Sequence, residues 1–280
     1  MPAENALYII LEEKIKQGAL VLPTLPKVAL KVREAVDDPN VNLAHLGNII
    51  EHDPALSLGM VKVANSALLG RTVKVESVSQ AVTRIGLSQI KSIVTAMALK
   101  QIFVSKNDIV AMYMDKSWNK TIDIASVAIS LMSMYLEKNK HTSLSLDTMT
   151  LAALVHNVGT LPILTEAEQH PDIFANPKFL QQAIAKLSGK VGGKVTREWG
   201  FSEELISVAE SWSDLTVLPE DIHYLDFIRA GSIYHNVFKS QLTQDSLLAA
   251  YVKKGILSDV NFMDTDNFKA RCTDVKSMFV

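Results

Sequence analysis

Hydrophobic residues recur along almost the whole chain at the three- and four-residue spacing of an amphipathic helix. Leu7, Leu11 and Ile15 begin this pattern, and Gly18 predicts the end of the first helix. The same spacing returns in short segments that prolines, glycines and Asp-Pro pairs separate. These segments are 28–36, 43–50, 54–70, 77–85 and 90–102. The first part of the chain is therefore predicted to be a bundle of short helices.

The second part of the chain contains longer hydrophobic stretches. Residues 109–136 are apolar on most faces, as expected of a helix at the centre of a bundle. Another helix is predicted to begin near Ser145 and to carry the apolar stretch 151–164. Further helical segments are expected at 178–187, 191–199, 203–212, 219–238 and 268–279. Only residues 71–75 have strand character, and this segment is too short and isolated to build a sheet. The pattern predicts an all-α fold, a multi-helix bundle.

The best candidate for a domain boundary is Lys106-Asn107-Asp108, in which Asn107 can cap the long central helix. We expect residues 1–105 to form an N-terminal helical subdomain and residues 106–280 to form a helical core with C-terminal helices. The sequence contains neither an internal repeat nor a long linker that would suggest another organisation.

The composition narrows the class of protein. A hydrophobic content of 48% with 21% charged residues indicates an ordered globular chain. The net charge of −2 provides no long-range attraction to nucleic acid or to acidic membranes. A single cysteine, Cys272, excludes an intrachain disulfide and a cysteine-rich metal site. The first residues carry an acid where a secretory signal would be basic, and the longest uncharged run, 148–165, contains His, Asn, Gly and Pro. We expect a cytoplasmic protein with neither a nucleic-acid partner nor a membrane partner.

The doublet His156-Asn157 lies in the apolar stretch 151–164 and is the strongest candidate in the sequence for part of a chemically active site. A His-Asp pair there would suggest two metal ligands. Asn offers a neutral carbonyl oxygen and lacks the charge that makes Asp a good ligand for a hard cation. One histidine cannot hold a catalytic metal, which needs about three protein ligands and an open position. The doublet therefore depends on partners elsewhere in the chain.

Several motifs together resemble the HDOD domain, the HD-related output domain. Five pieces match in order with tight spacing, and the similarity continues into the second part of the chain. The five pieces are 22–26, 37–39, 50–55, 63–67 and 79–87, and the later ones are 118–121, 152–159, 192–193 and 198–200. The resemblance covers roughly residues 15–215, and residues 216–280 have no assigned role. It implies that the N-terminal bundle packs on a degenerate HD-type helical core.

The HD phosphohydrolases, from which this family descends, hydrolyse phosphate esters with divalent metal held by His and Asp. The resemblance places Lys120 at the position of the first ligand histidine, and a lysine ammonium has no lone pair. Asn157 replaces the aspartate of the doublet, and Ser188-Gly-Lys190 stands where a third histidine is expected. The last two ligand regions read Glu210-Ser-Trp212 and Ala230-Gly-Ser232. Only His156 remains of the ligand set, so we predict no catalytic residue and no metal site.

The resemblance leaves a candidate relic pocket, in which positive charge could attract a small anionic ligand. Its predicted residues are Lys120, His156, Asn157, Ser188 and Lys190. The opposing hypothesis is a residual metal-dependent phosphohydrolase, whose missing ligands would be Asp123, Glu198 or Asp226. In that case a divalent metal at His156 would be the cofactor, and otherwise no cofactor is expected.

Two other features have a structural and a functional interpretation. Residues 188–194 look superficially like a phosphate-binding loop, but two glycines are one residue too close and Val195 stands where Ser or Thr would bind Mg²⁺. The structural interpretation is a basic face with glycines that permit close helix packing. Asn65 is a polar residue late in an apolar helix, and a hydrogen bond to neighbouring backbone is favoured over ligand contact.

The function predicted from the sequence is that of a non-catalytic bacterial signal-transduction module. It would act by binding a signalling protein, whose identity the sequence does not reveal, or a small ligand. The alternative is the residual metal-dependent phosphohydrolase or phosphodiesterase of the HD superfamily described above.

Overall fold

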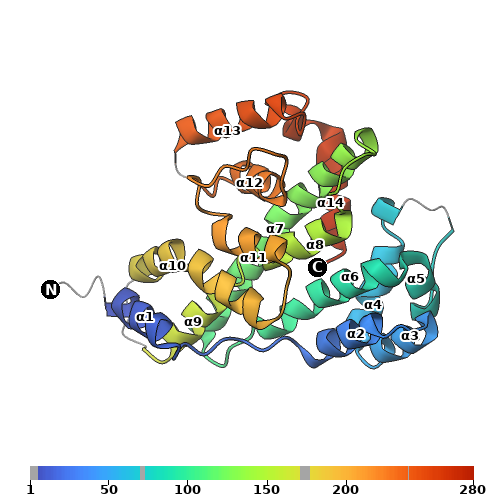
Figure 1. Ribbon diagram of the computed structural model, residues 1–280, viewed down its shortest axis with the longest axis horizontal. Helices are drawn as coiled ribbons and strands as arrows, with labels where there is room; N and C mark the ends of the chain where they lie inside the picture. Colours follow the sequence, from blue (N-terminus) through green and yellow to red (C-terminus); the bar gives the residue numbers. More distant parts are fainter. Residues whose placement is uncertain (1–5, 70–72, 171–176, 239) are drawn as a thin grey trace. The chain divides into compact units, whose positions relative to one another are not determined.

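A computed structural model describes residues 6–69, 73–170, 177–238 and 240–280. All regular secondary structure in these ranges is helical (Figure 1), and none of these residues forms a strand. The all-α prediction is confirmed. The weak strand character predicted at 71–75 falls partly outside the described residues, and its described part, 73–75, is irregular.

The helices follow one another with short connections. The first eight elements are α1 (Ala6–Gln17), α2 (Lys27–Asp37), α3 (Leu43–Glu51), α4 (Pro54–Ala64), the 3₁₀ turn η2 (Ala67–Leu69), α5 (Val78–Ile85), α6 (Leu87–Ala98) and the 3₁₀ turn η3 (Leu99–Ile102). The later ones are α7 (Asp108–Lys138), α8 (Leu146–Val155), α9 (Thr160–Glu168), α10 (Pro177–Glu198), α11 (Glu203–Ser211), α12 (Tyr224–Tyr234), α13 (Gln241–Lys253), the 3₁₀ turn η5 (Phe262–Asp264) and α14 (Asp266–Ser277).

Capping residues account for many of the observed helix ends. Asn42 Oδ1 accepts a hydrogen bond from the backbone N–H of His45 at the start of α3, over 2.8 Å. Asp53 caps α4 in the same way, and Pro54 occupies the first turn, where its missing N–H costs nothing. Gly18 closes α1 with a φ of 67°, a conformation that favours glycine. These signals were readable in the sequence, and the predicted starts of both helices are confirmed.

Several predicted boundaries differ from the structure. The helix starting at 54 ends at Ala64, well before residue 70. The stretch 151–164 is divided between α8 and α9, while the segments predicted at 178–187 and 191–199 form one continuous helix, α10. The helix predicted from residue 219 begins only at Tyr224, where His223 forms a capping box with Asp226. Helix α13 was missed because its apolar residues do not gather on one face.

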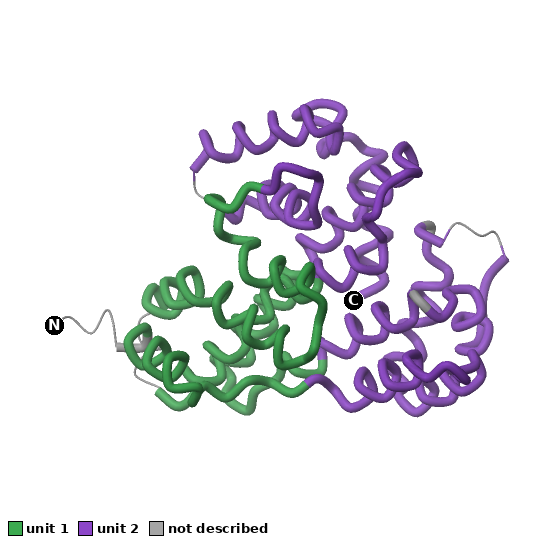
Figure 2. Tube along the Cα trace, in the orientation of Figure 1, with its two compact units in different colours: residues 1–24, 101–121, 154–218 green, residues 25–100, 122–153, 219–280 purple. Residues whose placement is uncertain are grey.

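The helices form two compact units, shown in Figure 2. Unit 1 comprises residues 1–24, 101–121 and 154–218, and unit 2 comprises the remaining segments 25–100, 122–153 and 219–280. Helix α7 contributes its first half to unit 1 and its second half to unit 2. That residues 1–105 form a separate subdomain stays a prediction.

Each unit has its own hydrophobic core. In unit 1, helices α9, α10 and α11 pack together, and α1 packs on α9 and α10 through Leu11 and Ile15, which are buried. In unit 2, helices α2 to α6 pack together, with fully buried Val32, Ile50 and Met60. His156 and Asn157 lie on a turn that connects two helices, and Ser188 lies on a helix face buried between helices.

Asn65, just after α4, holds the segment before α5 in place. Its Oδ1 accepts a hydrogen bond from the backbone N–H of Val75, and its Nδ2 donates to the carbonyl of the same residue, both over 2.8 Å. Val75 is only 4% exposed, so water does not easily replace these partners. The structural interpretation of Asn65 is confirmed.

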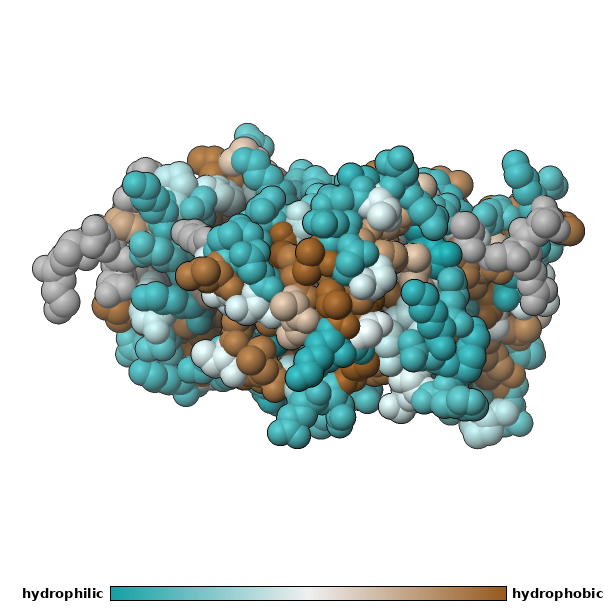
Figure 3. Space-filling model, turned by 90° about the horizontal axis from the view of Figure 1, so that it is seen from above, coloured by the Kyte–Doolittle hydropathy of each residue, from teal (hydrophilic) through white to brown (hydrophobic). Residues whose placement is uncertain are grey.

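The segment Leu146–Glu168, which contains α8 and α9, is apolar and long enough to span a bilayer by length and composition, and 83% of an 18-residue apolar window within it is buried inside the structure. Such burial is typical of a core helix of a soluble protein. Figure 3 shows one face of the molecule, on which hydrophilic and hydrophobic residues are intermixed.

Replacing Asn65 by Ala removes both hydrogen bonds and leaves the N–H and C=O of Val75 buried without them. We expect Asn65→Ala to lower the free energy of unfolding by about 1–3 kcal/mol. Asn65→Asp keeps an acceptor for the N–H but offers no donor to the carbonyl, and should recover part of the loss. Urea denaturation of the three proteins checks this order. An unchanged urea midpoint in Asn65→Ala would contradict a stabilising role of the two hydrogen bonds between Asn65 and Val75.

Candidate functional site

His156 and Asn157 lie in the turn between α8 and α9, and not inside a helix as the sequence pattern suggested. Helix α8 ends at Val155, and the N–H of Val158 donates to its carbonyl over 3.0 Å. The N–H of Thr160 donates in the same way to the carbonyl of Asn157 over 3.1 Å. These three-residue steps turn the chain tightly, so both side chains of the doublet are positioned by the ends of two buried helices.

The side chain of Asn157 bridges its own turn and helix α7. Its Oδ1 accepts a hydrogen bond from the hydroxyl of Thr160 over 2.7 Å. Its Nδ2 donates to the hydroxyl of Ser117 over 3.2 Å. The carbonyl oxygen that a metal would need is therefore already an acceptor in the structure. The neutral amide of Asn157 thus forms structural hydrogen bonds at a position where an aspartate would be negatively charged.

The imidazole of His156 packs against the indole of Trp212, just beyond α11. The ring centroids are 4.8 Å apart and the planes are nearly perpendicular, at 83°. His156 is 1% exposed and Trp212 is 7% exposed. The resemblance placed the fourth ligand region at residues 210–212, and the structure does bring this region to His156. It supplies an aromatic edge-to-face contact there, which stabilises by packing.

Gly159 allows helix α10 to approach the doublet closely. A methyl group at this position would overlap the carbonyl oxygen of Ser188 and the backbone nitrogen of Gly192. A methyl group at Gly189 would likewise overlap the carbonyl of Glu210 in α11. The glycines of α10 thus serve close helix packing, and this interpretation of residues 188–194 is confirmed. Ser188 is buried in the same contact, at 2% exposure.

Helix α7 contributes Ser117 and Thr121 to the interior of unit 1. Thr121 is 1% exposed, and its hydroxyl has no hydrogen-bond partner within the described ranges. Lys120, one residue earlier, is exposed. The structure therefore brings together His156, Asn157 and Ser188, while Lys120 lies at the surface of α7. That Lys120 takes part in ligand binding stays a prediction.

No three His, Cys, Asp or Glu side chains of the described residues gather closely enough to hold a metal ion. The three carboxylates considered as replacement ligands have other positions. Asp123 pairs with Lys276 over 2.6 Å, and Asp226 pairs with Lys254 over 2.9 Å. Glu198 is exposed near the end of α10. Each aspartate thus already has a lysine partner within its own unit.

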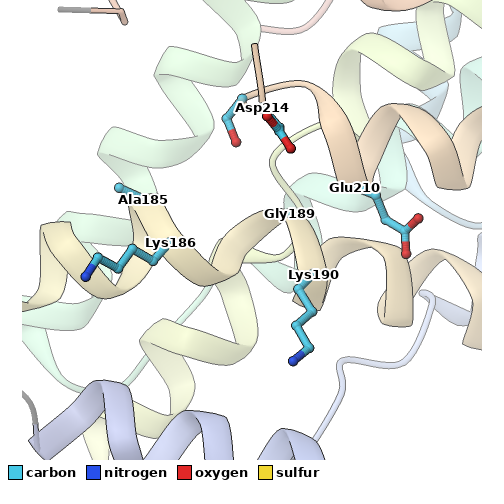
Figure 4. Close-up of a pocket in the computed structure, with 7 residues that line it drawn as sticks. Ala185, Lys186, Gly189, Lys190, Glu210 and Asp214 are labelled. Carbon is cyan, nitrogen blue, oxygen red and sulfur yellow. The ribbon is translucent and has the colours of Figure 1, made fainter. Parts of the chain in front are cut away.

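Lys190 lines a surface pocket of about 530 Å³ in unit 1, together with Lys186, Glu210 and Asp214 (Figure 4). Lys186 and Lys190 extend from the same side of α10, and the ammonium of Lys186 lies 5.3 Å from the ring centroid of Tyr8 in α1. The pKa of Glu12 is lowered, chiefly by a hydrogen bond from Tyr8 and, more weakly, by the charges of Lys16 and Lys190. Lys190 thus belongs to an exposed, charged surface, whereas His156 of the doublet is buried.

Sequence reasoning missed the partners of the doublet. Ser117, Thr160 and Trp212 each contact it, but none carries a recognisable ligand or nucleophile pattern. Trp212 was named only as part of a lost ligand region. Its position against His156 depends on the meeting of the turn after α8 with the end of α11, which periodicity does not reveal.

The closeness of Gly159 to α10 predicts a strong response to a single methyl group. We expect Gly159→Ala to lower the free energy of unfolding by about 1–3 kcal/mol or more, because backbone atoms of α10 must move. Gly47, in α3, is the matched control, since it is buried but a methyl group there meets nothing within 4 Å. Thermal unfolding of Gly159→Ala and Gly47→Ala should separate the two. An equal midpoint for both would contradict the packing described.

Comparison with known proteins places these features in a family. The family model of the HDOD domain matches residues 22–214. The crystal structure of a candidate metal-dependent phosphohydrolase from Shewanella amazonensis SB2B is 41% identical, covers 100% of both chains and has a TM-score of 0.95. An HDOD domain protein of unknown function from Geobacter sulfurreducens is 18% identical over 99% of both chains, with a TM-score of 0.64.

Two further proteins are also similar to this chain. A candidate signal transduction protein from Marinobacter aquaeolei VT8 is 19% identical, with a TM-score of 0.61, over 99% of this chain and 66% of that chain. An uncharacterized protein of Treponema pallidum (strain Nichols) is 23% identical over 211 residues, which are 71% of this chain and 39% of the relative. The chain thus spans about two fifths of that relative's length.

The family model covers well over half of the chain, and it includes the turn with His156 and the glycines of α10. The protein belongs to the HDOD domain family.

Proposed function

We propose that the protein is a non-catalytic regulatory module of bacterial signal transduction, which acts by binding a partner protein or a small ligand. The observation that carries this proposal is the packing of His156 on Trp212, at 4.8 Å between ring centroids. An aromatic side chain there leaves one imidazole where a metal site would need several ligands. Membership of the HDOD family agrees with a regulatory function.

The surroundings of His156 argue against metal-dependent hydrolysis on physical grounds. A divalent cation placed there would meet one neutral imidazole, an amide already engaged with Thr160, and an indole. Moving a cation from water into such an apolar interior is costly unless anionic ligands compensate for the lost hydration. A catalytic metal also needs an open position for water, and His156 is 1% exposed.

The surface at Lys186 and Lys190 is the proposed contact for a partner or an anionic ligand. Glu210, which also lines this pocket, is paired with Arg197 over 2.6 Å. Its negative charge is therefore partly offset, and the two lysines remain available to an acidic group. The relative from Marinobacter aquaeolei VT8 is named as a candidate signal transduction protein, which supports the same class of function.

The second candidate function is residual metal-dependent phosphohydrolysis. It is favoured by the name of the 41% identical protein from Shewanella amazonensis SB2B, a candidate enzyme of that kind. It would need ligands outside the constellation expected from the family. Asp123 and Asp226 would have to leave their lysine partners, and Glu198 would have to turn from the surface.

The two candidate functions predict different metal contents for the purified protein. We expect the purified full chain to contain no stoichiometric Mn, Fe, Zn or Ni by elemental analysis, because only one ligand of the family set remains. Asn157→Asp should not create hydrolysis of a chromogenic phosphodiester in the presence of Mn²⁺, since one carboxylate does not complete the set. Stoichiometric metal that His156→Ala removes would overturn the regulatory proposal and favour the enzyme.

Partner binding predicts a charge-sensitive surface on α10. We expect Lys190→Glu to weaken capture of the partner by the full chain several-fold, because it reverses a charge at the proposed contact. Lys106→Glu reverses the charge of another exposed lysine of unit 1 and is the matched control. Quantitative pull-down from bacterial cytosol measures both. Equal recovery with both variants would exclude this surface as the contact.

A further inference from the structure

A second pocket, of about 410 Å³, lies within unit 2, where the segment before α5 meets α5 itself. Its lining includes two basic side chains, Lys74 and Arg84, and three neutral polar ones, Ser79, Gln80 and Thr83. None of the described residues that line it carries a carboxylate. Within the described ranges, neither Lys74 nor Arg84 forms an ion pair. The pocket thus combines two positive charges that no acid of its lining compensates.

Arg84 is held in a defined orientation. Its Nη1 donates a hydrogen bond to the carbonyl of Ala64, at the end of α4, over 3.1 Å. A basic group at this place also interacts favourably with the negative end of the helix dipole, which is the structural explanation for the residue. A guanidinium has five N–H donors, however, and this contact uses one. The others form a fork suited to an oxyanion.

The second basic residue is carried by a segment that the fold fixes. Val75, next to Lys74, is held through both its backbone N–H and its carbonyl by the side chain of Asn65. Lys74 therefore extends from a backbone that is already ordered beside Arg84. Preorganisation of this kind lowers the entropic cost of binding a ligand.

Neutral donors complete the pocket. Gln80 Oε1 accepts a hydrogen bond from the backbone N–H of Glu76 over 2.9 Å, so its amide oxygen is engaged and its NH₂ group provides donors. Ser79 adds a hydroxyl, which can donate as well. The hydroxyl of Thr83 already donates its proton to the carbonyl of Ser79 over 2.9 Å, so the neutral donors come from Ser79 and Gln80. Every charged group of the lining favours an anion.

We propose that this pocket binds a phosphate monoester group. A phosphate of this kind carries roughly −1.5 to −2 charges near pH 7 and three strong acceptor oxygens. It matches two cations and several N–H and O–H donors better than a carboxylate, which carries one charge. The inference names a ligand chemistry for the regulatory function, but the site shares no residue with the turn at His156 or with the surface at Lys190.

The phosphate group has two sources, a free small phosphoester and a phosphorylated side chain of a partner. The pocket volume of about 410 Å³ falls within the range of roughly 300–1,000 Å³ typical of small-molecule sites, so it accommodates more than a bare ion. Inorganic phosphate and a short, otherwise neutral phosphoserine peptide separate these sources. The same peptide without phosphate serves as the negative probe.

Calorimetric titration of the full chain with the three probes tests the proposal. We expect saturable binding of a phosphate-bearing probe, weakened by added salt, and about a tenfold loss in Lys74→Ala, because one charged hydrogen bond is removed. Lys74 is exposed, so its removal should leave the fold intact. Lys31→Ala, which removes an exposed lysine of α2 in the same unit, should bind as the unaltered chain does.

Arg84→Lys provides a second variant, since it retains the charge but loses the planar fork. It should bind more weakly than the unaltered chain, with unchanged circular dichroism as the check on folding. Absence of saturable binding of both phosphate probes at about 1 mM, or equal losses in Lys74→Ala and Lys31→Ala, would overturn the proposal. His156→Ala should leave phosphate binding unchanged, so failure here is distinguishable from failure of the metal-free regulatory function.

Discussion

The close approach of Gly159 to helix α10 is the contact on which unit 1 depends. Without a side chain at this position, the backbone of Ser188 and Gly192 can lie directly against the turn between α8 and α9. The glycines of α10 allow the same closeness to α11, whose end brings Trp212 to His156. One steric condition therefore positions the doublet, Ser188 and the indole together. The close backbone contact therefore contributes more to the position of the turn than its polar side chains do.

Neutral contacts hold the turn at His156 in this arrangement. In a metal site, charged ligands and the cation hold several helices together. Here Asn157 bridges its turn to Ser117 and Thr160 by neutral hydrogen bonds, and His156 packs as an aromatic ring. Neutral contacts of this kind avoid the cost of burying uncompensated charge. The pocket with Lys74 and Arg84 carries its positive charges at the surface, where hydration offsets that cost.

The fold was largely predictable because its signals are local. Asn42, Asp53 and Gly18 mark helix ends through hydrogen bonds or backbone conformation within a few residues. The candidate site was less predictable, because its contacts join residues far apart in the sequence. Asn157 meets Ser117 across 40 positions, and no periodicity encodes that pairing. Glycines also misled the pattern, since those of α10 serve packing inside a helix and do not end it.

We propose that the turn at His156 is a packed structural element and not a metal site. Anomalous scattering from crystals of the full chain soaked in Mn²⁺ tests this most directly, because it locates bound metal at individual residues. We expect no anomalous peak within coordination distance of His156, with the imidazole still against Trp212. A peak bound by His156 and two or more further side chains would contradict it.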